Sequence, residues 1–445
     1  MRGRFTTGST ARHVVVMALT GSLGLITVFL VDFIDIYFIA QLNDPNKTAA
    51  VGFALNLMFF VRAAGLALSI AAGILVARNL GAGQERRARR LGCHATLLAV
   101  GLVSLLSLST YLLRRPLLQM LGASGASLSA ASDFLNYVLL TAPFLTAGFC
   151  GGQLLRALGQ GAQSMTVSIS VALINGLLDP LLIFKMNLGI DGAALATATA
   201  QVCMCLLAWG KLWRRFNFVN FRQLHQFTAD ISPIFANGLP VLLTNMATPL
   251  VLAFTSRAMA SFGNEAMSAY VVIMRFFPLV SAMILALSGA VAPIVGQNAG
   301  AGYYDRVHAT LYHALWFNWL LVLLISGALW LGREHLLQLF ELRGLGAELF
   351  LFFTSGLTLF IGFDGMMFYT ISSFNNLGRP FFGTVANLCR VLFGSIPLIL
   401  LGKYLYGAHG VLLGFMMQNV LVATVSFILL LLLVERQRQQ KNIHV

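Results

Sequence analysis

Charged residues are scarce in this chain. Asp, Glu, Lys and Arg make up 10% of its 445 residues, whereas a soluble domain carries roughly 25%. Hydrophobic residues account for 58%, and the mean hydropathy is +0.82. Apolar runs of about 20 residues, long enough to cross a bilayer as a helix, recur along the sequence, and no polar segment is long enough for a soluble domain. The composition therefore predicts an integral membrane protein.

Several chemical motifs are missing as well. The five cysteines fit no disulfide framework, and the eight histidines form no cluster with metal-ligand spacing. No GxxxxGK(S/T) motif is present, so nucleotide binding within this chain does not power its work. No HExxH or paired Gly-Asp motif is present either, which argues against an intramembrane enzyme. We expect no catalytic residues, no cofactor and no resident metal.

Twelve membrane spans are predicted, starting near residues 13, 49, 91, 133, 164, 189, 231, 264, 308, 347, 381 and 409. Lys and Arg are more than twice as frequent on one side of these spans as on the other, which places both termini in the cytoplasm. The first apolar run, about 30 residues long, exceeds that of a signal peptide, so we expect it to be retained. The net charge of +14 reflects this orientation and not nucleic-acid binding. We expect a multi-pass protein of a bacterial inner (plasma) membrane.

The second half of the sequence repeats the first. The loop ARNLGAGQERRARRLGCHA is matched by GQNAGAGYYDRVHATLYHA, and 219 residues separate Asn79 from Asn298. The same offset relates Arg87 to Arg306, His94 to His313, and LRALGQ to FNNLGR. A nearly constant offset across several spans indicates internal duplication.

The duplication predicts an all-α membrane fold of two six-helix bundles around a central cleft. We expect an N-terminal lobe over residues 1–215, a cytoplasmic linker over 216–230 and a C-terminal lobe over 231–445. Because each lobe has an even number of spans, the two are parallel repeats, related by an axis along the membrane normal. Two such bundles can open the cleft to either side in turn, and this favours a secondary transporter.

Four of the fifteen acidic residues fall inside apolar spans: Asp32, Asp35, Asp179 and Asp364. The other eleven, Asp230 among them, lie in loops or at span ends, where we expect them to be solvated. An Asp at the centre of a membrane helix costs roughly 2.5–3.5 kcal/mol on insertion scales. The four intramembrane acids are therefore candidates for function.

Asp179 has the most suggestive neighbours. Asn175 precedes it by four residues and shares its helix face, and Pro180 removes a backbone donor and frees carbonyl oxygens nearby. These oxygens suit a proton or a small hard cation. In the following span, Thr197 and Thr199 lie on a face of small residues that lets helices approach closely. Alternatively, Asn175 and the threonines only join helices by hydrogen bonds.

At this point the sequence resembles the MATE family, the multidrug and toxic compound extrusion transporters, over essentially its whole length. The resemblance rests on twelve spans in two homologous halves, the paired NLGAG and NAGAG loops, DIYFIAQL in span 1 and NGLLDPLLIF in span 5. It is strongest to the DinF-like branch, named for DNA-damage-inducible members. It implies efflux of drugs or toxic organic cations by antiport of H⁺ or Na⁺, with alternating access. We expect a monomer in contact with membrane lipid.

The resemblance also implies a cation-coupling pocket in the N-terminal lobe. Members of this branch use an acid in span 1, an Asn and an Asp in span 5 and a Thr in span 6. These correspond here to Asp35, Asn175, Asp179 and Thr197, with Thr197 favoured over the second threonine by spacing. Asp32 departs from the family pattern, and which of Asp32 and Asp35 is the main acceptor stays open. The pocket suits H⁺ and Na⁺ alike, with H⁺ favoured; Na⁺ would bind the same four residues.

A second group lies in the predicted C-terminal lobe. Asp364 aligns with an acidic position that another branch uses for coupling, but the partner acid of that branch is missing from VLLTNMATPLVLAFTSRA. We interpret Asp364 as a cleft residue that attracts cationic substrate, with coupling as the alternative. Arg275, like Arg62 and Arg390, either pairs with an aspartate or reaches the interface by snorkelling.

The nearest alternative function is that of a flippase for a lipid-linked precursor, from the same superfamily of folds. Such proteins tend to carry a strongly cationic cavity for phosphate head groups. Here four intramembrane Asp face three intramembrane Arg, and three of the Asp fall in the first half. This clustering favours cation coupling.

Overall fold

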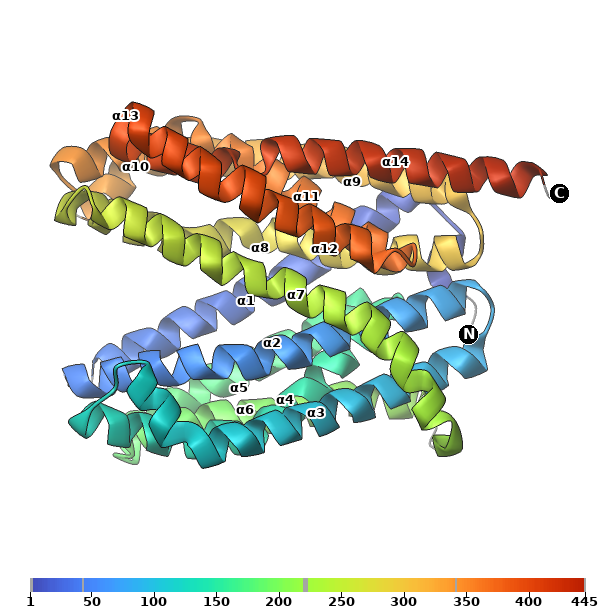
Figure 1. The fold of residues 1–445 in the computed structure, drawn as a ribbon. Helices are drawn as coiled ribbons and strands as arrows, with labels where there is room; N and C mark the ends of the chain where they lie inside the picture. The colour runs from blue at the N-terminus through green and yellow to red at the C-terminus, as the bar shows by residue number, and fades with distance from the viewer. Residues whose placement is uncertain (1–2, 42–43, 219–222, 341, 444–445) are drawn as a thin grey trace. The chain divides into compact units, whose positions relative to one another are not determined.

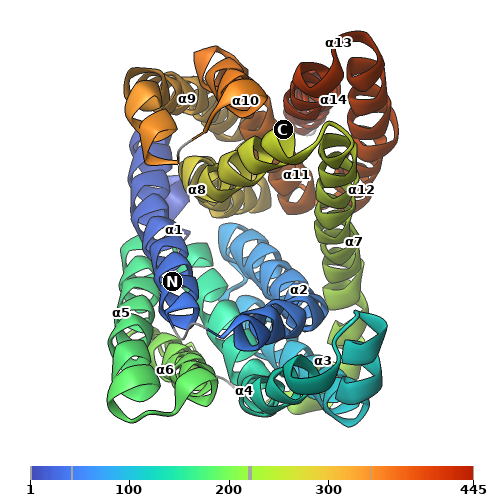
Figure 2. The same cartoon turned by 90° about the vertical axis from the view of Figure 1, so that its left-hand side faces the viewer.

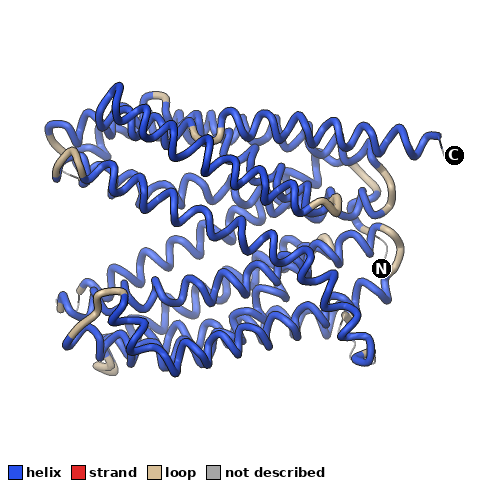
Figure 3. The backbone as a smooth tube through the Cα atoms, in the orientation of Figure 1, coloured by secondary structure: helices blue, strands red, loops and turns tan. Residues whose placement is uncertain are grey.

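The computed structural model describes residues 3–41, 44–218, 223–340 and 342–443. Within these ranges the chain is almost wholly helical and no residue is in a strand (Figure 3). The all-α membrane fold predicted from the sequence is confirmed.

The first half of the chain forms six long helices, preceded by a single 3-10 turn and interrupted by one π turn (Figure 1). In chain order the elements are η1 (Arg4–Thr6), α1 (Thr10–Ala40), α2 (Pro45–Gly81), α3 (Glu85–Met120), α4 (Gly125–Ala157), α5 (Gly161–Pro180), the π turn η2 (Leu181–Lys185) and α6 (Gly189–Phe216).

The second half repeats this order with shorter pieces near its end. Its elements are η3 (Leu224–Gln226), α7 (Phe227–Ala260), α8 (Asn264–Gly300), α9 (Tyr304–Leu339), α10 (Gly344–Ser355), η4 (Leu357–Phe360), α11 (Ile361–Asn376), α12 (Pro380–Cys389), the π turn η5 (Arg390–Ser395), α13 (Ile396–Met417) and α14 (Val420–Ile443).

Eleven stretches of the described residues are long and apolar enough to cross a membrane. The last, Pro380–Lys441, has 62 residues, whereas one crossing needs about 20. It is broken inside α13, where Tyr406 and Gly407 leave the helical conformation. This turn separates two crossings, which are the predicted spans starting near residues 381 and 409.

Glycines with positive φ recur at repeat-related positions. Their φ angles agree within 3° in four pairs: Gly83 with Gly302 (73° and 71°), Gly125 with Gly344 (54° and 52°), Gly159 with Gly378 (77° and 79°), and Gly189 with Gly407 (56° and 59°). L-residues with a side chain rarely adopt this conformation, whereas glycine does so at little cost. The two halves therefore share the backbone geometry of their loops as well as their sequence pattern.

The chain divides into two compact units whose boundary falls inside helices. The first unit contains Leu23–Leu80 and Gln84–Leu242, and the second contains Arg2–Ser22, Gly81–Gly83 and Leu243–Val445. The first part of α7 thus packs in the first unit, and the first part of α1 packs in the second. The halves exchange the beginnings of their first helices. The lobes at 1–215 and 231–445 remain a proposal from the sequence.

Each unit has its own apolar core. In the first unit, α4 packs along α6 and α3, and Leu135, Leu139 and Leu154 are fully buried. In the second unit, α11 packs against α8 and α14, and Phe350 and Tyr369 are among its largest buried side chains. A charged side chain buried in such an apolar core needs hydrogen-bond or ion-pair partners.

Candidate functional site

Asp35, Asn175 and Asp179 meet inside the first unit. Nδ2 of Asn175 donates to Oδ2 of Asp179 at 2.9 Å and lies 3.5 and 3.4 Å from Oδ1 and Oδ2 of Asp35. The carboxyl groups of Asp35 and Asp179 thus contact the same amide nitrogen. Asn175 is 9% exposed and Asp179 is 1% exposed. One buried amide therefore joins an acid of α1 to an acid of α5.

The end of α5 shapes the surroundings of Asp179. Pro180 is the last residue of α5 and has no N–H to donate to the preceding turn. The π turn η2 follows at once, and the N–H of Met186 donates to the carbonyl of Leu181 at 3.0 Å. Such wide turns are frequent at functional sites. Oδ1 of Asp179 is buried and has no hydrogen-bond partner among the described residues, so an acceptor is left for a proton or cation.

A cavity of about 380 Å³ lies beside this cluster, within the first unit. Its walls come from α1, α2, α4, α5 and α6, and Figure 2 shows these helices nearly end on. Its lining on α5 runs from Ser164 to Asn175, which is about 16 Å of helix. Thr197 lines it from α6. The cavity therefore reaches the acid cluster at the Asn175 end.

The structure brings three of the predicted coupling residues into contact and places Thr197 on the same cavity. Thr199 does not line the cavity, and its hydroxyl donates to the carbonyl of Leu195 in its own helix at 2.8 Å. Asp32 lies in α1, but its side chain is outside the part of the chain whose side chains are described.

Asp364 occupies a different setting in the second unit. It is 8% exposed, and Nδ2 of Asn419 donates to its Oδ1. Arg390 is buried in the same unit, and its Nε donates to Oδ1 of Asn387 at 2.9 Å. Arg275 is exposed. No ion pair joins Arg390 or Arg275 to an aspartate among the described residues, so the predicted pairing of an intramembrane Arg with an Asp stays a prediction.

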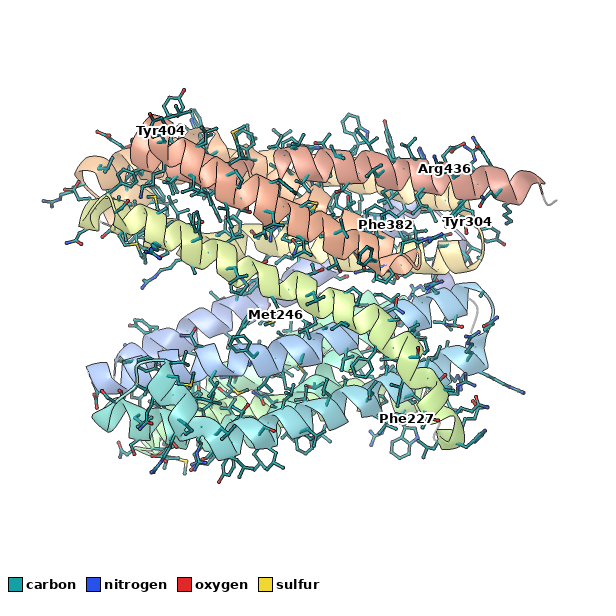
Figure 4. The ribbon with its side chains drawn as sticks, viewed as in Figure 1. Phe227, Met246, Tyr304, Phe382, Tyr404 and Arg436 are labelled. Carbon is teal, nitrogen blue, oxygen red and sulfur yellow. The ribbon has the colours of Figure 1, made fainter. Side chains whose placement is uncertain are left out.

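Asp230 corrects the expectation of solvated acids at span ends. It is 5% exposed, accepts hydrogen bonds from Nε and Nη2 of Arg90 at 2.9 and 3.2 Å, and lies 2.7 Å from Nδ1 of His94. Phe227, labelled in Figure 4 at the start of α7, packs edge-on against the His94 ring with 5.4 Å between centroids. The expectation failed because the first part of α7 packs into the first unit and buries its acid.

Sequence reasoning also missed polar residues that line the cavity, Arg156 above all. Arg156 lies in the last turn of α4 and lines the cavity together with Gln153. The signal was available, because residues three positions apart share a helix face. It is weak, since the same spacing also occurs on solvated faces.

Comparisons with known proteins agree with this architecture. The sequence profile of the MatE family matches residues 22–181 and 240–401, one segment in each half. A FAD transporter of Shewanella oneidensis is 28% identical, with the alignment covering 93% of this chain and 92% of the relative. The multidrug export protein MepA of Staphylococcus aureus is 24% identical over the same shares.

A solved structure shows the same fold. The Vibrio cholerae MATE transporter VcmN in the bent form superimposes with a TM-score of 0.90 over 98% of each chain, at 24% sequence identity. The family match covers most of both halves. This chain therefore belongs to the MatE family, and it is a multi-pass membrane transporter and not an enzyme.

Proposed function

We propose that this protein exports small amphipathic organic compounds by cation antiport, with H⁺ as the coupling ion, at Asp35, Asn175 and Asp179. The observation that carries the proposal is the single amide that joins the buried carboxyl group of Asp179 to the half-buried one of Asp35 beside a cavity. The names of two relatives, a multidrug export protein and a FAD transporter, support small organic molecules as substrates.

The arrangement favours a proton over Na⁺. Two ionised carboxylates this close repel each other strongly where water is scarce, and one added proton removes the repulsion and forms an O–H···O bond. The amide nitrogen of Asn175, a hydrogen-bond donor, faces both carboxyl groups. A Na⁺ ion bound between the two acids would need an oxygen atom of Asn175 at this position instead of the nitrogen.

The proposed cycle couples this proton to the substrate. When the site faces outward, the acids of α1 and α5 take up a proton, and when it faces the cytoplasm they release it. One unit charge moving inward yields about 2.3 kcal/mol per 100 mV, and about 1.4 kcal/mol corresponds to a tenfold concentration ratio. For an uncharged substrate, one proton per cycle at 100 mV therefore sustains a gradient of between about tenfold and a hundredfold.

The remaining elements of the proposal follow the sequence. The lobes at 1–215 and 231–445 would move relative to one another, with both termini in the cytoplasm of a bacterial cell. Asp364 serves as a cleft residue that attracts cationic substrate, with coupling as the alternative; it is buried and accepts a hydrogen bond from Asn419.

Transport in proteoliposomes tests the proposal. Ethidium and flavin mononucleotide, one cationic and one anionic, are followed under an imposed pH gradient or an imposed Na⁺ gradient. We expect the pH gradient to drive transport in the wild type, and Asp35→Asn and Asp179→Asn to abolish it while folding is kept. Asp133→Asn, an exposed acid of the first unit, is the matched control. Unimpaired transport in both acid variants would rule out the proposed pair, and transport driven only by Na⁺ would replace the proton.

A further inference from the structure

The cavity of the first unit is basic. Its lining includes Arg62 on α2 and Arg156 on α4, and no Asp or Glu is among the described residues that line it. Asp35 and Asp179 contact the cavity residue Asn175 without lining the cavity themselves. The two arginines therefore line the cavity, whereas the proposed proton site lies next to it at Asn175.

Arg156 has neutral partners. Its Nη1 donates to Oγ of Ser164 at 3.0 Å, and its Nε lies 3.4 Å from Oε1 of Gln153. No ion pair joins it to a carboxylate among the described residues. A guanidinium carries five N–H donors, and these two contacts use two of them. Donors of Arg156 therefore remain for an acceptor in the cavity.

A second donor without an acceptor lies further along the cavity. Gln201 is 4% exposed and lines the cavity, and its Nε2 has no partner among the described residues. Its Oε1 accepts from the hydroxyl of Thr141 at 2.8 Å. Thr141 precedes Arg156 on α4 by 15 residues, or about 22 Å of helix. Gln201 therefore lies away from Arg156, toward Asn175.

The space between these donors is mostly apolar. Phe149, Met204, Leu25 and Val28 line it, and Met beside an aromatic ring adapts to flat ligands of different outline. A volume of about 380 Å³ lies in the range of roughly 300–1,000 Å³ that small-molecule sites occupy.

A purely structural role does not account for Arg156. A basic residue in the last turn of a helix is favoured by the helix dipole, and one at the cytoplasmic end of a span is favoured by the orientation rule. Either reason explains an arginine near Ala157. Neither explains why its guanidinium turns toward Ser164 of α5 at the cavity, or why Gln201 keeps a buried donor unsatisfied.

We propose that Arg156 and Ser164 form an anion-binding subsite, and that the substrates include aromatic compounds bearing a phosphate or carboxylate group. The anionic group binds at Arg156 and the flat body lies against Phe149 and Met204, and Nε2 of Gln201 is a further donor for substrates long enough to reach it. The inference rests on the proposed export function and names its substrate class. It extends the expectation of cationic substrates drawn from the sequence.

Equilibrium binding to the purified protein in nanodiscs tests the subsite, using pairs that differ only by a phosphate: flavin mononucleotide with riboflavin, and 1-naphthyl phosphate with 1-naphthol. In each pair we expect the phosphate to bind roughly tenfold tighter or more, because a hydrogen bond to a charged group contributes about 1.5–3 kcal/mol. Arg156→Gln should remove this preference and leave the neutral member's affinity unchanged. Arg86→Gln, at an exposed residue, changes the net charge equally and should keep it.

If Arg156→Gln aggregates on size-exclusion chromatography, Arg156→Lys is used to test the phosphate preference instead. Lysine keeps the charge but loses the planar fork that binds phosphate through two donors, so the preference should shrink. An equal affinity within both pairs overturns the subsite, as does an equal loss in the Arg86 and Arg156 variants. Displacement of flavin mononucleotide by phosphatidic acid in the nanodisc would assign the phosphate to a lipid head group and overturn the soluble substrate.

The binding assay separates this inference from the proposed function. No gradient is imposed, so Asp35→Asn and Asp179→Asn should keep the phosphate preference. If the phosphate preference is found but gradient-driven transport continues without either acid, only the proposed coupling is wrong. If transport needs both acids but the two members of each pair bind equally, only the subsite is wrong.

Discussion

Nδ1 of His94 lies 2.7 Å from Oδ2 of Asp230, and Arg90 donates to both oxygens of the same carboxylate. His94 and Arg90 belong to α3 in the first repeat, whereas Asp230 belongs to α7, the first long helix of the second. These three residues, which we call the first clasp, hold the beginning of the second repeat inside the first unit.

The second unit holds the beginning of the first repeat in a related way. Nη2 of Arg306 donates to the carbonyl of Phe5 at 2.9 Å, and Nδ2 of Asn298 donates to the same carbonyl at 3.2 Å. Phe5, Asn298 and Arg306 form the second clasp. His313, the repeat partner of His94, lies 3.1 Å from the hydroxyl of Thr10. Each repeat thus uses the start of its third helix to hold the other repeat's first segment.

Asp230→Asn is expected to destabilise the first unit. The change leaves Arg90 and His94 without their carboxylate, and removing one partner of a buried ion pair costs about 3–5 kcal/mol. Because Arg90 is partly exposed, with 18% of its side chain accessible, the lower end of that range applies. Thermal unfolding in detergent should show a lower midpoint for this variant and an unchanged one for Asp133→Asn.

A double-mutant cycle separates the pair from its parts. Arg90→Gln combined with Asp230→Asn leaves no unbalanced charge between these two positions. The double variant should therefore lose less stability than the two single variants lose together. Strict additivity would show that the two side chains do not act on each other.

Phe5→Ala is expected to loosen the second clasp. Phe5 is 2% exposed and packs into the apolar core of the second unit, and truncating a buried Phe costs about 3–5 kcal/mol. Limited trypsin cleavage after Arg12, an exposed residue, should become faster in this variant. Phe381→Ala removes a ring that is 71% exposed and should leave the cleavage rate unchanged; equal rates in all three proteins would contradict the clasp.

Asn175→Ala is expected to stop transport without unfolding the protein. The change removes the donor shared by Asp35 and Asp179 and leaves both acids in place, so the pair keeps its charges but loses the group that positions them. Transport of flavin mononucleotide under a pH gradient should fall to the level of empty liposomes, with the unfolding midpoint close to that of the wild type. Asn136→Ala, in α4 outside this cavity, is the control. Normal transport by Asn175→Ala would show that the amide has no part in coupling.

Local features of the site followed from the sequence. A spacing of four residues placed Asn175 and Asp179 on one helix face, and their side chains are hydrogen bonded at 2.9 Å. Pro180 predicted a weakened turn, and α5 ends there. These features depend on residues close together in the chain, for which helix geometry alone fixes the distances.

Features that depend on packing between distant segments did not follow. The sequence gives Asp230 a polar neighbourhood at a span end, and only the exchange of first helices buries it. Periodicity could not separate Arg156 from a solvated arginine, because the cavity that it lines is formed by five helices. The π turn η2 also has no sequence signature beyond the proline before it. In each case the deciding partners lie far away in the chain.

Gly410→Ala is expected to disturb the turn that divides the last apolar stretch into two crossings. A Cβ at Gly410 would lie 1.9 Å from the carbonyl oxygen of Gly402, which is backbone and cannot rotate away. Overpacking of this kind costs typically about 1–3 kcal/mol. The variant should unfold at a lower temperature, whereas Gly289→Ala, whose Cβ would have no neighbour within 4 Å, should match the wild type. Equal midpoints would show that this contact has room to relax.

Substrate binding should depend on pH through the same acids that couple transport. Antiport requires that proton and substrate do not occupy the transporter together in one stable state, so protons that fill the Asp35–Asp179 pair weaken substrate binding. By linkage, the affinity for riboflavin, which is uncharged near neutral pH, should fall as the pH falls, by at most about tenfold per pH unit for one competing proton. Asp35→Asn and Asp179→Asn should flatten this dependence, and Asp133→Asn should leave it unchanged. If the affinity of both acid variants for riboflavin depends on pH as steeply as that of the wild type, the competing proton binds elsewhere, because neither variant has both acids of the pair.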